Sequence, residues 1–446
     1  MAGRPSTAQS LAVWLNGERV GIWEIPRNAD PSFTYAESWF DSPAFRPVSL
    51  SLPALRVNPT VKGEQVNAYF DNLLPDSDVI RRRLQAKFKT QDTGAIALLA
   101  AVGRDCVGAV QVLPAGEQPS GIDSIDAVPL DDAGVEHMLR QATTSPNAMT
   151  PDEHDDDLRL SIAGAQEKTA LLWHKGVWCK PLGATPTTHI FKLPLGLVGN
   201  RRADMSTSVE NEWLCSRILR AYGIPVAHCE IATFGASKAL VVERFDRRLA
   251  LAGTHWLRLP QEDFCQATAT PASAKYENEG GPGMVSITRL LAGSQHAAAD
   301  IATFLKAQIV FLLLRATDGH AKNFSIFLQG GGEYRMTPLY DVLSAWPIIG
   351  QGPNLIPPQR VKMAMAWLGK NRHYFAGIVR KSHVEETARK CGYAADPAQL
   401  VDEVIAQTPA VIAQVAKELP SGFPQKLAKQ IFDGLERGSR SLTTNS

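Results

Sequence analysis

The sequence lacks paired cysteines, an apolar leader and any long apolar run. Its six cysteines are far apart and never form a Cys-x-x-Cys pair, which argues against a disulfide framework or a zinc site. The first residues contain no apolar stretch of the signal-peptide kind. The most apolar run, residues 309–314, is too short to cross a bilayer. We therefore expect a cytoplasmic protein that has no membrane partner.

The sequence also lacks an excess of charge of either sign. Lys and Arg together number 46, and Asp and Glu together number 45, so no overall positive field exists that would attract nucleic acid. Any contact with DNA would therefore depend on a local basic patch or on a partner protein. The cluster Arg81-Arg82-Arg83 is one such patch, although a solvated helix face is the simpler interpretation.

What the sequence does have is a change of pattern along its length. The early part combines a hairpin around Asn16-Gly17, an alternating stretch at 49–52 that predicts a strand, and a helical stretch at 66–89 that is broken at Pro75-Asp76. Strand-like segments predominate further on, and a helix is expected at 208–222 with Ser208 as its cap. The last part is chiefly helical, apart from a hairpin at 324–337.

This order of patterns predicts an α+β fold with two lobes, preceded by a small N-terminal α/β subdomain. Strands dominate the first lobe and helices dominate the second. The expected parts are the N-terminal subdomain at 1–115, a linker with one helix at 116–157, the first lobe at 158–248 and the second lobe at 249–446.

The sharpest chemical signal is the pair Asp318 and Asn323, which are separated by Gly-His-Ala-Lys. The catalytic loop of protein kinases has the same spacing, because its Asp must face the attacking hydroxyl while its Asn holds Mg²⁺ on the nucleotide. The spacing is common by chance, and Asp-Gly-His is also typical of a plain turn. Its position between a predicted helix and a predicted strand favours the kinase interpretation.

A second carboxylate, Asp341, follows the hairpin predicted at 324–337. A hairpin of this length would bring Asp341 back beside the Asp318 loop. There its carboxylate and the Asn323 side chain could supply the oxygen ligands that Mg²⁺ prefers. The alternative is that Asp341 caps a helix that begins at Val342.

Lys192 lies in the otherwise apolar, strand-like segment Thr188-His-Ile-Phe-Lys-Leu. A lysine at this place needs an anionic partner, and the helix downstream offers Glu210 and Glu212, of which we prefer Glu212. Kinases use such a lysine to hold the α- and β-phosphates of the nucleotide. The alternative is a lysine at the edge of a sheet that faces solvent.

The stretch Ser161-Ile-Ala-Gly-Ala-Gln-Glu-Lys168 comes just before the first strand of this lobe. Its small residues would let backbone N–H groups approach phosphate. It matches neither of the two common glycine-rich patterns for phosphate binding, so the stretch alone is a weak signal.

Taken together, these stretches are similar to those of the HipA family of bacterial serine/threonine kinase toxins, which act with HipB-type antitoxins. The similarity extends from about residue 10 to residue 425. The motifs that carry it are Tyr69-Phe-Asp-Asn-Leu-Leu-Pro-Asp, Ser161-Ile-Ala-Gly-Ala-Gln-Glu-Lys, Pro186-Thr-Thr-His-Ile-Phe-Lys-Leu-Pro, Val242-Glu-Arg-Phe-Asp-Arg-Arg, Leu257-Arg-Leu-Pro-Gln-Glu-Asp-Phe-Cys-Gln, Ala316-Thr-Asp-Gly-His-Ala-Lys-Asn-Phe-Ser and Pro338-Leu-Tyr-Asp.

The resemblance implies a two-lobed kinase of the phosphoinositide-kinase-like type that uses ATP and Mg²⁺. It implies that Asp318 is the catalytic base, that Asn323 and Asp341 bind Mg²⁺, and that autophosphorylation of Ser161 ejects the phosphate loop and inactivates the kinase. The remaining residues implied to border the nucleotide are Ala163, Gly164, Ala165, Gln166, Glu167 and Lys168 of the phosphate loop, Lys192, the hinge residues Glu243, Arg244 and Phe245, and His320, Ala321, Lys322 and Tyr340.

The implied function is that of a toxin that phosphorylates a translation component, typically glutamyl-tRNA synthetase, and thereby causes growth arrest and persistence. The implied partners are a HipB-type antitoxin and, through it, operator DNA, with a homodimer as one arrangement of that complex. Two alternatives stay open. A small-molecule kinase of the aminoglycoside-phosphotransferase kind shares the Asp-x₄-Asn spacing, and a non-catalytic co-repressor would need only the antitoxin complex.

Overall fold

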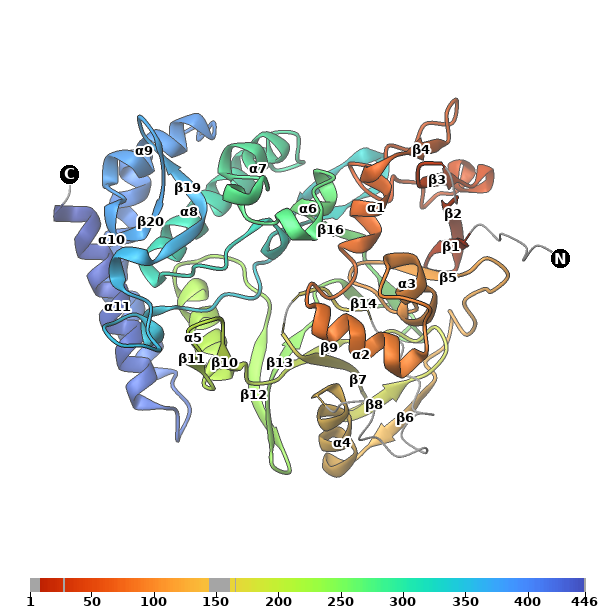
Figure 1. Ribbon diagram of the computed structural model, residues 1–446, viewed down its shortest axis with the longest axis horizontal. Helices are drawn as coiled ribbons and strands as arrows, with labels where there is room; N and C mark the ends of the chain where they lie inside the picture. Colours follow the sequence, from red (N-terminus) through yellow and green to blue (C-terminus); the bar gives the residue numbers. More distant parts are fainter. Residues whose placement is uncertain (1–8, 27–28, 144–160, 165, 445–446) are drawn as a thin grey trace, which may run out of the picture.

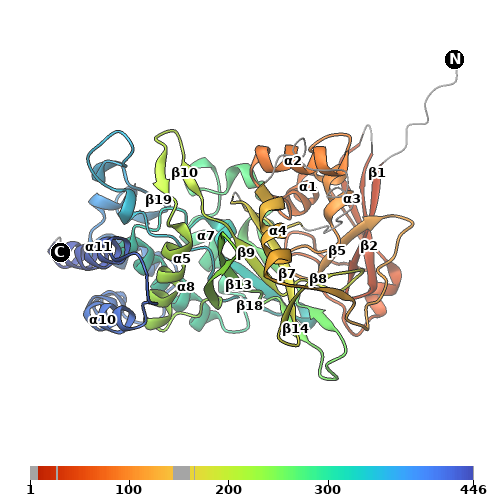
Figure 2. The same ribbon diagram turned by 90° about the horizontal axis from the view of Figure 1, so that it is seen from below.

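The structure is a computed structural model that describes residues 9–26, 29–143, 161–164 and 166–444. The N-terminal subdomain lies against both lobes, and its helix α1 (Glu64–Asp71) is beside α6 (Phe264–Ala267) of the second lobe (Figure 1). The N-terminal subdomain lies at one end and the last two long helices lie at the other, with the strand-rich first lobe between them (Figure 2). The predicted arrangement of a small subdomain, a strand-rich lobe and a helical lobe is confirmed.

The N-terminal subdomain is built on an antiparallel sheet with the strand order β4-β3-β2-β1-β5. The β1–β2 hairpin turns at Asn16 and Gly17, both of which have positive φ, as the Asn-Gly dipeptide predicts. The elements are β1 (Gln9–Leu15), β2 (Glu18–Ile25), β3 (Ser32–Tyr35), β4 (Thr60–Lys62), α1 (Glu64–Asp71), α2 (Asp78–Phe88), α3 (Ala95–Val102) and β5 (Val110–Pro114).

Two local predictions in this subdomain have different outcomes. The helical stretch at 66–89 is broken near Pro75, as expected, because α1 ends before it and α2 begins after it. The strand predicted at 49–52 is wrong, since only an isolated bridge joins its two ends. The reason is a long-range contact: the Ser49 hydroxyl and the Leu50 amide both donate to the buried Glu262 carboxylate, at 2.5 and 2.8 Å.

The first lobe contains a six-stranded sheet with the order β12-β13-β9-β7-β8-β6. Its outermost strand β6 belongs to 116–157, which was expected to be a linker with one helix, so this segment is partly a component of the lobe. The elements are β6 (Ala127–Leu130), α4 (Asp132–Thr143), β7 (Lys168–His174), β8 (Val177–Pro181), β9 (His189–Lys192), β10 (Gly196–Val198), β11 (Ala203–Met205), α5 (Ser208–Ala221), β12 (Cys229–Phe234) and β13 (Ser237–Glu243).

Strand alternation sends side chains of this sheet to two different cores. Phe191 and Val241 pack with α4 on one face, whereas Leu240 and Val242 pack with α5 on the other. Lys192 pairs with Leu240 across β9 and β13, so its side chain points to the α5 face. The sheet register therefore brings this lysine towards the carboxylates of α5.

The second lobe is mainly helical. Its elements are β14 (Arg247–Leu249), β15 (Trp256–Arg258), β16 (Gln261–Asp263), α6 (Phe264–Ala267), α7 (Met284–Leu291), α8 (Ala297–Leu314), β17 (Ser325–Leu328), β18 (Tyr334–Met336), β19 (Lys362–Leu368), β20 (Arg372–Phe375), α9 (Lys381–Lys390), α10 (Pro397–Lys417) and α11 (Gln425–Thr444). The predicted hairpin at 324–337 is present as β17 and β18. The β19–β20 hairpin was not predicted, because Met-Ala-Met-Ala in β19 consists of residues that favour helices.

Helix α8 is the central helix of this lobe. In the described part of the chain it alone is long and apolar enough to cross a membrane by length and composition, but 61% of that span is buried inside the protein. It contacts α7, α10 and α11. A core position explains its apolar composition. The helix ends at Arg315, which has positive φ and begins the loop that carries Asp318.

The position of α8 generates a stability prediction. Leu312 is 1% exposed, whereas Leu251 is fully exposed. We expect Leu312→Ala to lower the free energy of unfolding by about 2–5 kcal/mol, because it removes buried apolar contacts and leaves a cavity. Leu251→Ala is the matched control and should change it by less than about 0.5 kcal/mol. Urea denaturation followed by circular dichroism measures both, and equal effects of the two substitutions would contradict the assigned core.

Candidate active site

A cleft of about 1030 Å³, open mouth included, lies where the two lobes and the N-terminal subdomain meet. This volume is in the upper range for pockets that bind small molecules. Its lining includes Asn72, Leu73, Asp76 and Val107 from the N-terminal subdomain, Ala163, Gly164, Lys168, Lys192, Glu243, Arg244 and Phe245 from the first lobe, and Lys275, Asp318, His320, Lys322, Asn323, Tyr340 and Asp341 from the second lobe.

Lys192 joins the two lobes at the floor of this cleft. Its Nζ donates to Oε1 of Glu212 at 2.6 Å and to Oδ1 of Asp341 at 2.7 Å. Burial disfavours the charged lysine, but the carboxylates of Asp341 and Glu212 outweigh burial and raise the pKa of Lys192. The preferred partner Glu212 is thus in place, while Glu210 pairs with Lys238 instead.

Lys168 lies directly beside Lys192, because the two residues are partners across β7 and β9. Its Nζ donates to the Ala163 carbonyl at 2.6 Å, and it forms no ion pair within the described residues. Burial lowers the pKa of Lys168 to about 8. Two like charges at opposite positions of neighbouring strands are unfavourable unless an anion lies between them. This pair therefore fits a site for phosphate groups.

Asp341 comes back beside the catalytic loop, as the hairpin predicted. The helix that it might have capped is not there, since the chain from Val342 forms only a short 3-10 turn at Trp346–Ile348. Its backbone has a φ of 60°, a conformation that costs a non-glycine residue about 1–3 kcal/mol and is concentrated at functional sites. Burial would raise the pKa of Asp341, but Lys192 and Lys168 lower it, so the carboxylate stays ionised.

The loop from Asp318 to Asn323 is held by its own hydrogen bonds. The Asn323 side-chain amide donates to the Asp318 carbonyl at 2.7 Å, and the His320 amide donates to the same carbonyl at 2.8 Å. The Asn323 side-chain oxygen therefore stays available as an acceptor. The Asp318 side chain is 55% exposed, so its carboxylate stands at the mouth of the cleft where a second molecule can reach it.

Tyr276 contacts this carboxylate. Its hydroxyl donates to Oδ1 of Asp318, and its ring stands at 89° to the ring of His320, with the centroids 5.0 Å apart. Burial lowers the pKa of His320. Tyr276 was not predicted as a site residue, because nothing local to residues 271–280 indicates that they fold over the Asp318 loop.

The N-terminal subdomain supplies a further carboxylate that the sequence analysis did not assign to the site. Asp76 accepts hydrogen bonds from Lys275 at 2.7 Å and from Lys322 at 2.6 Å. Burial would raise the pKa of Asp76, but Lys322 and Lys275 lower it to about 2. The only signal for it was its place in the Leu-Leu-Pro-Asp motif. Lys322 lines the cleft as expected, although its ammonium group is bound to Asp76.

The same subdomain holds the phosphate loop, residues 163–168. The Asp76 amide donates to the Gly164 carbonyl at 3.1 Å. Ser161, just before the loop, is fully buried, and its hydroxyl donates to the Leu73 carbonyl at 2.7 Å. The loop is therefore fixed by contacts with residues about ninety positions earlier in the chain.

Not every residue expected at the nucleotide lines the cleft. The Gln166 side chain donates to the Leu193 carbonyl at 2.5 Å, and Glu167 pairs with Arg83 at 2.5 Å. Both face a second cavity between α2 and α4, so the expectation does not hold for these two side chains. Ala321, within the Asp318–Asn323 loop, is fully buried, and Ala165 lies outside the described residues. The Arg83 contact also shows that this arginine is more than a solvated face.

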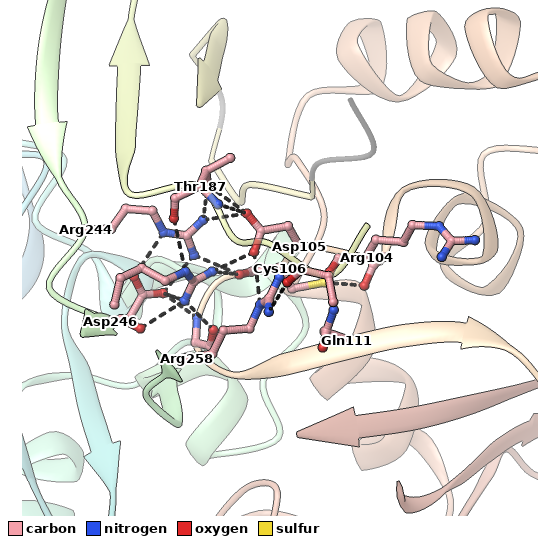
Figure 3. Close-up of polar contacts among 12 residues, drawn as sticks. Arg104, Asp105, Cys106, Gln111, Thr187, Arg244, Asp246 and Arg258 are labelled. Carbon is pink, nitrogen blue, oxygen red and sulfur yellow. Dashed lines mark hydrogen bonds and ion pairs between the residues drawn. The ribbon is translucent and has the colours of Figure 1, made fainter. Parts of the chain in front are cut away.

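The hinge segment, residues 243–245, combines two orientations. Glu243, Arg244 and Phe245 all line the cleft, but the Arg244 guanidinium points away from it, into the cluster drawn in Figure 3. There Arg244 Nη1 lies 3.3 Å from Asp105, and Arg244 Nη2 lies 2.8 Å from Asp246. The side chain of Arg244 thus positions the hinge, and only its backbone can contact a nucleotide.

Asp105 is the centre of this buried cluster. Besides Arg244 it binds Arg247 at 2.9 Å and Arg258 at 3.2 Å, and it accepts the Thr187 hydroxyl at 2.7 Å. Burial would raise the pKa of Asp105, but the three arginines lower it, the largest effect coming from Arg247. A residue of the N-terminal subdomain therefore fixes the hinge between the kinase lobes.

Comparisons with known proteins agree with this geometry. The family described as "HipA-like C-terminal domain" matches residues 160–412, and "HipA N-terminal domain" matches residues 11–113. The chain belongs to the HipA family. The resemblance that the motifs indicated is thereby confirmed.

Three relatives illustrate the range of similarity. "Putative kinase Y4mE" of Sinorhizobium fredii is 36% identical over 80% of this chain and 81% of its own. "Serine/threonine-protein kinase toxin HipA" of Shewanella oneidensis is 28% identical over 76% of each chain. "Putative kinase Y4dM" of Sinorhizobium fredii is 27% identical over 84% of this chain and 86% of its own.

A solved structure confirms the fold. It is that of the Shewanella oneidensis MR-1 HipA, determined in a complex with HipB and its operator DNA. The two chains superpose with a TM-score of 0.76 over 97% of each, at 23% identity. The α+β bilobal kinase fold that the sequence predicted is therefore shared across the whole length of the described structure.

The Asp105 cluster generates a stability prediction. We expect Asp105→Asn to lower the free energy of unfolding by about 3–5 kcal/mol, because three guanidinium groups lose their shared buried carboxylate. The matched control is Glu117→Gln, just after β5, which breaks the partly exposed ion pair with Arg104 of the subdomain and should cost less than about 1 kcal/mol. Urea denaturation compares the two. A loss from Asp105→Asn as small as that of the control would contradict the role of the cluster.

Proposed function

We propose that this chain is an ATP- and Mg²⁺-dependent serine/threonine protein kinase and the toxin of a toxin–antitoxin pair. The observation that supports this proposal most is the double ion pair of Lys192 with Glu212 and Asp341. Active protein kinases need a strand lysine paired with a helix glutamate, together with a metal-binding aspartate beside the catalytic loop. All three elements meet here in one place.

The cleft fits the triphosphate of ATP. Lys168 and Lys192 are cations on adjacent strands, the first half-buried and the second buried, and only Lys192 forms ion pairs with carboxylates among the described residues. Ala163 and Gly164 line the cleft beside Lys168, whose Nζ donates to the Ala163 carbonyl. At the other end, Ile190, Val242 and Phe245 offer apolar surface for the adenine base, and the hinge backbone offers hydrogen-bonding groups to its edge.

The donor set also fits Mg²⁺, although it is incomplete without the nucleotide. Among the described residues no group of three or more His, Cys, Asp or Glu side chains could hold a metal. Mg²⁺ commonly binds one or two side-chain oxygens and completes its shell with substrate phosphates and water. Asn323 and Asp341 would provide those oxygens. The ion, when bound, would neutralise the charge that develops on the transferred phosphoryl group.

The position of Asp318 supports a role as the base. Its backbone is fixed by Asn323 and His320, while its carboxylate reaches the mouth of the cleft. We assign it the role of accepting the proton from the hydroxyl of a serine or threonine. Lys192 and Lys168 would hold the phosphates in line with that hydroxyl, so the chain itself contributes chiefly position and charge.

Ser161 is the proposed site of autophosphorylation. Its hydroxyl is fully buried against Leu73, so the residue must leave this place before it can be phosphorylated. A phosphate adds about −1.5 to −2 charges, which the buried site beside the Leu73 carbonyl does not accommodate. Phosphorylated Ser161 would therefore keep the phosphate loop out of the cleft and leave the kinase inactive.

The biological role that we propose follows the family. In the cytoplasm the kinase phosphorylates a translation component such as glutamyl-tRNA synthetase, which causes growth arrest and persistence. It also binds operator DNA through a HipB-type antitoxin, and a homodimer is one arrangement of that complex. The HipB and operator DNA in the related Shewanella complex support this partner class. The net charge of +1 supports a partner that makes most of the DNA contacts.

Autophosphorylation tests the proposed catalytic base. Wild-type protein incubated with ATP and Mg²⁺ should gain one phosphate on Ser161, and Asp318→Asn should slow this reaction about a hundredfold or more, because the hydroxyl loses its proton acceptor. Asp402→Asn, which removes an exposed carboxylate on α10, is the control. Mass spectrometry of the intact protein and its peptides measures the rates. Equal rates in all three proteins would contradict the role of Asp318, and ATP binding without any phosphate would favour the co-repressor.

A lysine pair tests the proposed phosphate site. Lys192→Gln should reduce phosphotransfer roughly a hundredfold, because a buried positive charge on the phosphates is lost. Lys238→Gln is closely matched, since Lys238 lies on β13 of the same sheet and also pairs with a glutamate of α5, and it should keep nearly full activity. Transfer of ³²P from ATP to Ser161 gives both rates. The same assay with kanamycin as acceptor tests the small-molecule alternative.

A further inference from the structure

Tyr276 contacts the carboxylate that we assign as the catalytic base. Its hydroxyl donates a hydrogen bond to Oδ1 of Asp318. If Asp318 is the base, an acceptor hydroxyl must donate to this carboxylate before it can lose its proton. The phenol hydroxyl of Tyr276 is therefore placed where the hydroxyl of an acceptor has to come.

The backbone around Tyr276 is anchored from both sides. Lys275 binds Asp76 of the N-terminal subdomain at 2.7 Å. On the other side, Glu277 accepts the Ala366 amide of β19 at 2.6 Å, and the Gly281 amide donates to the Tyr276 carbonyl at 3.0 Å. With the backbone held in this way, the contact with Asp318 can be broken by rotation of the Tyr276 side chain alone.

The electrostatics favour a contact that persists until something replaces it. Burial and the charge of Asp318 raise the pKa of Tyr276, so the hydroxyl stays protonated and remains a donor. A hydrogen bond from a neutral donor to a carboxylate is stronger than one between two neutral groups. The ring packs edge-on against His320 but is only half-buried, which leaves it a path towards solvent.

We propose that Tyr276 is a gate over the catalytic base that determines which hydroxyls reach Asp318. The inference rests on the proposed kinase function. A serine or threonine hydroxyl, presented by a protein that docks against residues 271–283, displaces the phenol and donates to Asp318 in its place. Its proton then passes to Asp318 while its oxygen bonds to the γ-phosphorus of ATP, the bond from that phosphorus to ADP breaks, and ADP leaves.

A single water molecule lacks the docking contacts by which a protein acceptor could offset the loss of the hydrogen bond between the phenol and Asp318. The gate therefore keeps hydrolysis of ATP slow in the absence of an acceptor. It also separates two functions of one segment: Lys275 and Glu277 keep the segment attached to its neighbours, and Tyr276 between them covers the base.

The test is the initial rate of ATP hydrolysis, without an added acceptor and before Ser161 is phosphorylated, for wild type, Tyr276→Phe and the control Tyr393→Phe. The phenylalanine keeps the ring against His320 and removes only the hydroxyl. We expect Tyr276→Phe to hydrolyse ATP about tenfold faster, which corresponds to about 1.4 kcal/mol, and to phosphorylate dephosphorylated casein with a lower KM for casein. Tyr393→Phe should behave as wild type, because Tyr393 lies remote from the cleft at the end of α9.

If Tyr276→Phe hydrolyses ATP no faster than wild type, while wild type still phosphorylates Ser161, the proposed gate is overturned. The proposed kinase activity is not. A phosphate found on Tyr276 itself would also overturn it, since the residue would then be an acceptor. If wild type transfers phosphate to none of Ser161, casein and water, the kinase proposal is wrong, and so is the gate that rests on it. Tyr276→Leu provides a second variant, and its ATP affinity and melting temperature are measured beside its rate of ATP hydrolysis. A rise in that rate cannot come from partial unfolding.

Discussion

The buried ion pairs of Lys192 are the constraint on which the arrangement of the two lobes depends. Lys192 comes from the sheet of the first lobe, Glu212 from the helix behind that sheet, and Asp341 from the second lobe. Removing such charges from water costs several kcal/mol per ion, so the pairs persist only if the surrounding fold holds all three groups in good geometry. That fold includes the sheet register that directs Lys192 towards α5, and the positive φ that turns Asp341 into the cleft. The charged groups of Lys192 and Asp341 that join the two lobes are also those that a nucleotide and its metal ion would contact.

The N-terminal subdomain is a structural part of this site. Asp76 binds two lysines at the edge of the cleft, and Asp105 binds three arginines behind the hinge. Backbone groups of the subdomain also hold Ser161 and the phosphate loop. Any partner that shifts this subdomain therefore acts on the phosphate loop and the hinge at once. These contacts form a continuous set that joins the subdomain to the active site.

Much of the fold and the centre of the site could be predicted from the sequence, because their signals are local. The Asn16-Gly17 turn, the break at Pro75, the β17–β18 hairpin and the pairing of Lys192 with Glu212 all follow from residues close in sequence. The rest depends on contacts between distant segments. Ser49 turns towards Glu262 and forms no strand, Ser208 accepts the Leu195 amide while Thr207 occupies the cap position, and Gln166 and Glu167 turn away from the cleft. Tyr276 and Asp76 reach the site only through tertiary packing, which no local pattern encodes.

The most direct test of the account is a crystal structure of this chain with a non-hydrolysable ATP analogue and Mn²⁺, whose anomalous scattering locates the metal. The account predicts the triphosphate between Lys168 and Lys192, and the metal at about 2.0–2.1 Å from side-chain oxygens of Asn323 and Asp341, the distance expected for Mg²⁺. The terminal phosphate should then face Asp318. A nucleotide bound elsewhere, or a metal that neither Asn323 nor Asp341 contacts, would contradict the assignment of this cleft as the phosphotransfer centre.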